Sequence, residues 1–106
     1  MKKILLISSP TIAAKILVKR TKHACNKNTR VGEAFMCDIT ILPKNEAKEH
    51  ITSYDALILP PSLRYLLGKT EQINMPEGMP VAVIDSKMYG DLDGDGVLSL
   101  IEGLFD

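Results

Sequence analysis

The sequence lacks the features that would mark a membrane, metal-binding or disulfide-stabilised protein. No apolar run approaches the length of a membrane span. The two cysteines, Cys25 and Cys37, have neither metal-ligand spacing nor a disulfide framework, so we expect both to be buried, inert thiols. His23 and His50 are unpaired in sequence, which argues against catalysis by either. With no internal repeat, linker or low-complexity segment, the 106 residues are predicted to form one domain, residues 1–106.

The first residues carry the charge of a secretory signal without its apolar segment. Lys2 and Lys3 precede the apolar run Ile4–Ile7, but Lys15 and Lys19 interrupt the sequence beyond it. A signal peptide needs a longer uninterrupted apolar region. We therefore expect a cytoplasmic protein with no direct membrane insertion.

The formal net charge is zero, yet charges of opposite sign are concentrated in different parts of the chain. Residues 1–30 contain eight lysines and arginines and no acid, whereas residues 71–106 contain eight acids and a single base, Lys87. A basic segment can attract nucleic acid or an acidic protein. Because no aromatic residues are interleaved with the basic ones and no binding motif is recognisable, we expect no nucleic-acid partner.

Short apolar runs alternate with segments of helical spacing along the chain. The runs predict buried strands near Lys3–Ile7, Ala56–Leu59 and Val81–Ile84, and a partly alternating stretch predicts an outer strand near Ala34–Ile41. The predicted helices are Ile12 to about Cys25, Asn45–Ile51, Ser62 to about Gln72 and Val97 to about Leu104. Asn45 and Ser62 are the expected caps of the second and third of these helices. A turn is predicted at residues 26–28 and a Gly- and Asp-rich loop at residues 88–96. This β-α repetition predicts an α/β fold with a parallel sheet.

Right-handed crossovers decide which face of the sheet each helix covers. If the strands, numbered along the chain, lie in the order 2-1-3-4, the first helix covers one face and the next two cover the other. The final helix then folds back most simply beside the first. The expected domain has three layers, with the basic first helix next to the acidic C-terminal segment.

The loop Ser8–Thr11 follows the first strand, at the carboxyl edge of the predicted sheet. Such a loop places backbone N–H groups at the positive end of a helix, where anions bind, and ligands often bind at this edge. The simpler explanation is that Ser9 or Thr11 caps the helix. Arg64 and Asp85 are expected near the same edge, where each suits either a functional role or an ordinary structural one.

The segment Asp91–Glu102 fits the calcium loop of an EF-hand. Carboxylates occupy loop positions 1, 3, 5 and 12 and a glycine occupies position 6. An EF-hand also needs an entering helix, whereas this segment follows a predicted strand, and only four residues follow Glu102. We therefore prefer a loop in which Asp93 or Asp95 caps the final helix, and we expect no metal site.

Three segments carry a family resemblance. They are K-K-I-L-L at residues 2–6, Y-D-A-L-I-L-P-P-S-L-R-Y-L-L at residues 54–67, and P-V-A-V-I-D followed by Y-G and D-G at residues 80–94. The last two resemble the D-hydrophobic-L-G-P-Q-x-R-Y-M-L and P-V-x-V-I-D-x-x-x-Y-G-x-x-D-G segments of the enzyme-IIB component of the lactose/cellobiose (chitobiose) family of the sugar phosphotransferase system. This resemblance covers nearly the whole chain. It implies a sheet of order 2-1-3-4, similar to low-molecular-weight tyrosine phosphatases, with no cofactor.

The resemblance also implies a site and partners. In the family, the cysteine of C-x-x-G-x-S-T-S takes a phosphoryl group from a IIA protein and passes it to sugar bound by the membrane component IIC, while loop amides cradle the phosphate. Here Ser8 occupies the cysteine position, and the matching phosphate-loop residues are Ser9, Pro10, Thr11, Ile12, Ala13 and Ala14. The matching second loop contains Pro61, Ser62 and Arg64.

The departures from the family pattern remove the thiol nucleophile, one backbone N–H donor and a glycine that the family's loop carries. A serine hydroxyl is a weak nucleophile without a base, and no His or Asp is adjacent to Ser8 in sequence. Pro10 lacks an N–H group, and Thr11 adopts positive φ less readily than glycine does. Cys25 cannot replace Ser8, because it lies 14 residues beyond Thr11, roughly 20 Å along a helix.

Three interpretations remain open at this point, and with them the question of whether the chain is an enzyme. It is a working IIB component whose cysteine was exchanged for serine by design, a diverged IIB-like domain that binds partners or an anion without transfer, or a calcium-binding interaction module built on Asp91–Glu102. Because the whole loop differs and not Ser8 alone, we prefer the second.

The calcium interpretation leads to a direct test. We expect no stoichiometric calcium binding at micromolar affinity, because the entering helix of an EF-hand is missing. Isothermal titration calorimetry with calcium chloride measures this, and tight binding of one ion per chain would contradict the expectation.

Overall fold

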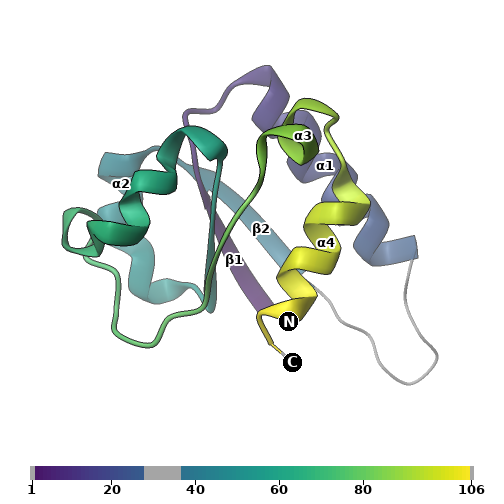
Figure 1. Cartoon of the computed structure of the whole chain (residues 1–106). Helices are drawn as coiled ribbons and strands as arrows, with labels where there is room; N and C mark the ends of the chain where they lie inside the picture. Colours follow the sequence, from purple (N-terminus) through teal and green to yellow (C-terminus); the bar gives the residue numbers. More distant parts are fainter. Residues whose placement is uncertain (1, 28–36, 106) are drawn as a thin grey trace.

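A four-stranded sheet with helices on both faces forms the domain (Figure 1). The structure is a computed structural model that describes the backbone of residues 2–27 and 37–105 and the side chains of residues 2–25 and 38–105. The strands are β1 (Lys2–Ile7), β2 (Cys37–Leu42), β3 (Ala56–Leu59) and β4 (Val81–Val83). Their order is β2-β1-β3-β4 and every neighbouring pair is parallel, which confirms the predicted fold class and strand order.

The strand boundaries differ slightly from the prediction. Residues 34–36 of the predicted second strand lie outside the described residues, and the described strand begins at Cys37. Ile84 follows β4 rather than belonging to it, although its N–H group still donates to the Leu59 carbonyl at 2.8 Å.

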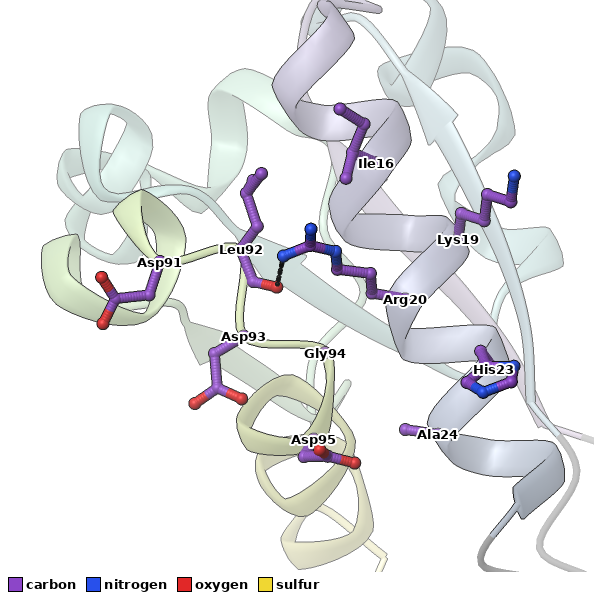
Figure 2. Close-up of a pocket in the computed structure, with 10 residues that line it drawn as sticks. All are labelled: Ile16, Lys19, Arg20, His23, Ala24, Asp91, Leu92, Asp93, Gly94 and Asp95. Atoms are coloured by element: carbon purple, nitrogen blue, oxygen red, sulfur yellow. Dashed lines mark hydrogen bonds between the residues drawn. The ribbon is translucent and has the colours of Figure 1, made fainter.

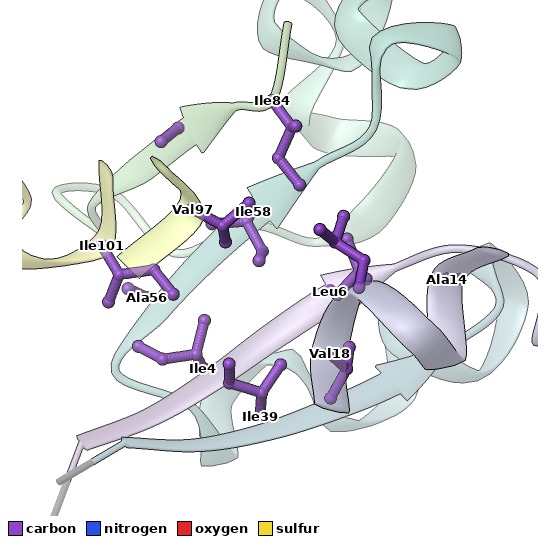
Figure 3. Packing of buried hydrophobic residues seen from close by; sticks show 12 residues of the cluster. Ile4, Leu6, Ala14, Val18, Ile39, Ala56, Ile58, Ile84, Val97 and Ile101 are labelled. Carbon is purple, nitrogen blue, oxygen red and sulfur yellow. The ribbon is translucent and has the colours of Figure 1, made fainter. Parts of the chain in front are cut away.

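The central strand β1 is buried on both faces, which explains its uninterrupted apolar run. Ile4 and Leu6 belong to one apolar cluster, and Leu5 and Ile7 belong to another on the opposite face. Figure 3 shows the first cluster, in which Ile4 and Leu6 lie among side chains from neighbouring strands and from two helices. The sheet therefore separates two cores, and both depend on the same four residues of β1.

The helices divide between these two cores as the crossover rule predicts. The long helices α1 (Ile12–Lys27) and α4 (Gly94–Gly103) cover one face side by side. Helix α2 (Lys44–His50) and three 3₁₀ segments cover the other. These segments are η1 (Ile51–Ser53), η2 (Pro61–Gly68) and η3 (Thr70–Ile73). Within the described residues, no helix combines the length and apolar character needed to cross a membrane.

Two predicted features around the first two helices are wrong. The turn predicted at residues 26–28 does not begin at Asn26, because α1 continues through Lys27, and residue 28 lies outside the described part. Asn45 is not a cap: α2 begins one residue earlier, after Pro43, whose φ of −67° leads the chain into the helix without a side-chain hydrogen bond. Cys25 is buried in α1, as predicted.

The predicted helix from Ser62 to about Gln72 is also wrong in type and in its cap. The chain forms η2 and η3 instead, and the N-cap of η2 is Pro60, with no side-chain hydrogen bond. Pro60 and Pro61 restrict the backbone conformation at the start of η2. Lys69 adopts a non-helical φ of −139° between η2 and η3. Short 3₁₀ turns therefore replace one continuous α-helix.

The predicted loop at residues 88–96 contains a short helix, α3 (Ser86–Gly90). Asp85 caps α3 by accepting a hydrogen bond from the Met88 N–H group at 2.7 Å. Asp93 caps α4 by accepting from the Gly96 N–H group at 2.9 Å, as predicted for Asp93 or Asp95. Because of this cap, α4 begins at Gly94, three residues before the predicted start.

Helices α1 and α4 touch at Gly94. A Cβ atom added to Gly94 would lie 2.5 Å from the backbone carbonyl carbon of Arg20 and 2.7 Å from its Cβ. Only a residue without a side chain fits at this separation. The predicted proximity of the basic helix and the acidic C-terminal segment is confirmed by this contact.

Gly94→Ala is therefore expected to destabilise the protein by about 1–3 kcal/mol, because the added methyl group forces two helix backbones apart. The measurement is the free energy of unfolding in urea. Gly103→Ala is the matched control in the same helix, since nothing lies within 4 Å of a Cβ there. We expect its stability to be unchanged or raised by up to about 1 kcal/mol. Equal effects of the two substitutions would contradict the close contact.

Candidate functional site

Three segments meet at the carboxyl edge of the sheet and line a cavity of about 500 Å³ that is open to solvent. The first is the loop between β1 and α1, the second is the segment after β3, and the third is α3. The lining residues are Ser8, Ser9, Thr11, Pro60, Pro61, Ser62, Leu63, Ser86, Tyr89 and Gly90. We call this the serine cavity.

Ser8 is fixed at the end of β1. Its N–H group donates to the Leu42 carbonyl of β2 at 3.0 Å, which continues the β1–β2 pairing by one residue. Its hydroxyl donates to the carbonyl oxygen of Ser9 at 2.9 Å, and only 8% of the residue is exposed. The Ser8 hydroxyl is thus engaged with the backbone of its own loop.

The loop is closed by a tight turn around Pro10. The Thr11 N–H group donates to the Ser9 carbonyl at 2.7 Å, an i to i+2 bond of the γ-turn type that suits the fixed φ of proline. The Thr11 hydroxyl accepts a hydrogen bond from the Ala14 N–H group at 3.2 Å, which confirms Thr11 as the cap of α1. The Ser9 carbonyl therefore accepts two hydrogen bonds, from the Ser8 hydroxyl and from the Thr11 N–H group. Within the described residues, the N–H groups of Ile12 and Ala13 at the start of α1 make no hydrogen bond.

The serine cavity contains hydroxyl groups and no formal charge. Six of its ten lining residues carry a hydroxyl, and none is Asp, Glu, His, Lys or Arg. A serine nucleophile needs an adjacent base, and no lining residue can act as one near neutral pH. The cavity is suited to hydrogen bonding and is poorly equipped to activate Ser8.

The structure brings part of the predicted site together. Ser8, Ser9, Thr11, Pro61 and Ser62 line the serine cavity. The other predicted residues lie outside its lining: Pro10, Ile12, Ala13, Ala14 and Arg64.

Three of the residues outside the lining differ in how exposed they are. Ala14 is buried on the core-facing side of α1, whereas Ile12 is 78% exposed at the start of the same helix. Arg64 is exposed on η2.

The third wall of the serine cavity was missed because α3 was not predicted. Ser86, Tyr89 and Gly90 come from this five-residue helix, too short for a periodic apolar pattern. The signal in the sequence was Asp85, a favoured N-cap residue type directly after a buried strand. Asp85 itself makes the capping bond and does not line the cavity.

A second cleft, of about 730 Å³, lies between α1 and the segment that leads into α4 (Figure 2). Lys19, Arg20 and His23 lie on its α1 wall. Asp91, Asp93 and Asp95 lie on the opposite wall. The Arg20 guanidinium spans the cleft and donates to the Leu92 carbonyl at 3.2 Å.

Two of the four carboxylates of the predicted calcium pattern serve local structure. Asp91 pairs with Lys87 at 2.8 Å, and this hydrogen bond and charge raise the pKa of the Lys87 ammonium above its ordinary value. Asp93 caps α4. Among the described residues, no group of three or more His, Cys, Asp or Glu side chains is placed to hold a metal ion.

Known proteins resemble the chain over most of its length, although no family model matches it. The oligo-beta-mannoside-specific EIIB component of the PTS system from Bacillus subtilis (strain 168) is 30% identical over 94 residues, which cover 89% of this chain and 86% of that protein.

Solved structures agree with this likeness. The cellobiose-specific phosphotransferase IIB component from Borrelia burgdorferi superposes with a TM-score of 0.73 at 28% identity, over 98% of this chain and 91% of that one. The lactose-specific IIB component domain from Streptococcus pneumoniae gives a TM-score of 0.72 over 99% of this chain and 98% of that one, and at 13% identity it shows the fold alone.

The cap of α1 can be tested through Thr11. Thr11→Ala removes the acceptor for the Ala14 N–H group, and we expect the free energy of unfolding to fall by about 1 kcal/mol. Thr11→Ser keeps the hydroxyl and should lose much less. Urea denaturation compares the two variants, and equal losses would show that the methyl group of Thr11, and not its hydroxyl, is what stabilises the helix.

Proposed function

The chain belongs to the lactose/cellobiose family of IIB components of the sugar phosphotransferase system, and we propose that it is a diverged member that accepts no phosphoryl group at Ser8. The observation that carries this proposal is the hydrogen bond from the Ser8 hydroxyl to the Ser9 carbonyl at 2.9 Å. It holds the hydroxyl proton on a neutral acceptor that cannot remove it. An attack by Ser8 on phosphorus would require that proton to leave.

The chemistry of the nucleophile supports the same proposal. A thiol at the start of a helix ionises readily, and its thiolate is the attacking species. A serine hydroxyl has a much higher pKa and depends on a neighbouring general base. No residue lining the serine cavity is a carboxylate, an imidazole or an amine.

The backbone of the loop is also poorly arranged for a phosphoryl group. Pro10 has no N–H group, the Thr11 N–H group donates to the Ser9 carbonyl, and the Ala14 N–H group in the first turn of α1 donates to the Thr11 hydroxyl, which leaves those of Ile12 and Ala13 as the donors at this end of the helix. The Ser9 carbonyl oxygen lies 2.9 Å from the Ser8 oxygen. A phosphoryl group on Ser8 would place negative charge next to this carbonyl, where the family pattern instead supplies donors.

We propose that the chain still binds the partners of a IIB component although it transfers no phosphoryl group. The fold of the IIB family is kept over nearly the whole chain. Ile12 is 78% exposed at the start of α1, beside the loop that carries Ser8, and it offers an apolar contact to a docking protein. Family membership implies two partners. They are a IIA protein and the cytoplasmic side of the membrane component IIC.

The proposal is tested by phosphoryl transfer to three forms of the chain. The first is the wild-type protein, the second is Ser8→Cys, and the third carries the family loop. The third form combines Ser8→Cys, Pro10→Ala, Thr11→Gly, Ala13→Ser, Ala14→Thr and Lys15→Ser. Each form is incubated with the same phosphorylated IIA protein and then measured by intact mass spectrometry, with the Bacillus relative as positive control.

We expect no phosphoryl group on the wild-type chain. Ser8→Cys should label about a hundredfold or more slowly than the full loop form or the positive control, because one missing amide donor alone costs about that much. Rapid labelling of the wild-type chain would overturn the proposal. Rapid labelling of Ser8→Cys, equal to the positive control, would show that Ser8 was the sole defect, whether or not the full loop form folds.

A further inference from the structure

The cleft between α1 and the segment that leads into α4 takes no part in the function proposed above. It is lined by parts of residues 16–24 and by residues 91–95, and it shares no lining residue with the serine cavity. We call it the charged cleft. Its volume of about 730 Å³ lies within the range of sites for small organic molecules.

The two walls of the charged cleft carry opposite charges that do not neutralise each other. Figure 2 shows the Arg20 side chain reaching from α1 toward residues 91–95, and the Asp95 carboxylate on the α4 side of the same space. Within residues 2–25 and 38–105, no ion pair joins the two walls, and the Asp95 carboxylate makes no hydrogen bond. Separated charges of this kind are complementary to a ligand that carries both signs.

The Arg20 guanidinium is held in place but is not saturated. It donates one hydrogen bond, to the Leu92 carbonyl at 3.2 Å. A guanidinium has five N–H donors, so the others can bind an anionic group such as a carboxylate. His23, one turn further along α1, adds an exposed imidazole to the same wall. A cation fixed in this way loses little freedom when a ligand binds.

The backbone keeps the charged cleft at a fixed width. Gly94 contacts the backbone of Arg20 so closely that a Cβ atom would lie 2.5 Å from the Arg20 carbonyl carbon. Leu92 adopts a φ of 52°, in the left-handed region that favours glycine, and in this conformation its carbonyl accepts from Arg20. Backbone outliers of this kind often occur at binding sites. The charged cleft is therefore formed before any ligand enters.

The width and the apolar lining restrict the ligand further. One arginine side chain spans the charged cleft, so the two charges of the ligand must be separated by a comparable length (Figure 2). The amino and carboxylate groups of a free amino acid share one carbon atom and are too close together. A peptide of two or three residues extends over roughly 7–11 Å. Ile16, Ala24 and Leu92 give the cleft apolar surface that suits one apolar side chain of such a peptide.

We infer that the charged cleft binds a short peptide with free ends. The carboxylate end lies at Arg20 and His23, and the amino end lies at Asp95. This inference goes beyond the proposed function and does not depend on it, because the charged cleft and the serine cavity are separate.

The test uses the full wild-type chain, labelled with nitrogen-15, at pH 7 and low salt. Four forms of the peptide Ala-Leu-Ala are titrated: with free ends, N-acetylated, C-amidated, and blocked at both ends. Amide chemical shifts are recorded by NMR. We expect saturable shifts at Arg20, Gly94 and Asp95 with the free peptide. Blocking either end should raise the dissociation constant about twofold to fivefold, the effect of one exposed ion pair, and blocking both should raise it further.

Paired variants locate the binding. Asp95→Asn and Arg20→Gln each remove one charge from the charged cleft and should each raise the dissociation constant of the free peptide about twofold to fivefold. Glu102→Gln and Lys15→Gln are the matched controls. They make the same charge changes on the same two helices, at exposed positions outside the charged cleft, and should leave the constant unchanged.

Three results would overturn the inference. They are the absence of a saturable shift with the free peptide, equal binding of the free and doubly blocked peptides, and equal effects of the cleft variants and their controls. The peptide comparison needs no variant, so the inference stays testable even if Arg20→Gln unfolds the chain. None of these results bears on phosphoryl transfer to Ser8, which is measured separately.

Discussion

The burial of β1 on both faces is the constraint on which the rest of the structure depends. Ile4 and Leu6 anchor the core under α1 and α4, and Leu5 and Ile7 anchor the core under α2 and the 3₁₀ segments. A strand held from both sides cannot shift its register without exposing one set of these residues. Its carboxyl end is therefore fixed, and with it the position of Ser8 between the two helical layers.

The sheet and helices determine the stability of the fold, whereas the loop after β1 determines which chemistry its edge can support. The structure superposes on a IIB component over 98% of this chain, and the loop after β1 is held by hydrogen bonds among its own residues. In that loop, the Ser9 carbonyl accepts from Ser8 and from Thr11, and Thr11 caps α1. These bonds stabilise the start of α1 and engage the N–H groups of Thr11 and Ala14, while Pro10 supplies no N–H group.

The sequence was informative where periodicity or residue chemistry acts locally. Buried apolar runs predicted three of the four strands, and a partly alternating stretch predicted the outer one. Crossover handedness predicted the layers, and the oxygen side chains of Thr11 and Asp93 predicted two helix caps. Short elements gave no such signal: α3 and the 3₁₀ turns after Pro60 span too few residues for an apolar period. The direction of the Ser8 hydroxyl depends on how the loop closes around Pro10, and the third wall of the cavity depends on α3. Both arise from tertiary structure and not from spacing along the chain.

The central claim is that the loop after β1 is closed on itself, with the Thr11 and Ala14 N–H groups engaged within the chain and not offered to an anion. The most direct measurement follows the Thr11 and Ala14 amide signals by NMR while inorganic phosphate is added, together with their rates of hydrogen exchange. A closed loop predicts slowed exchange at both amides in the free chain and no saturable shift with phosphate. Fast exchange in the free chain, followed by saturable shifts and protection when phosphate binds, would show instead that these donors are open to an anion and would contradict the claim.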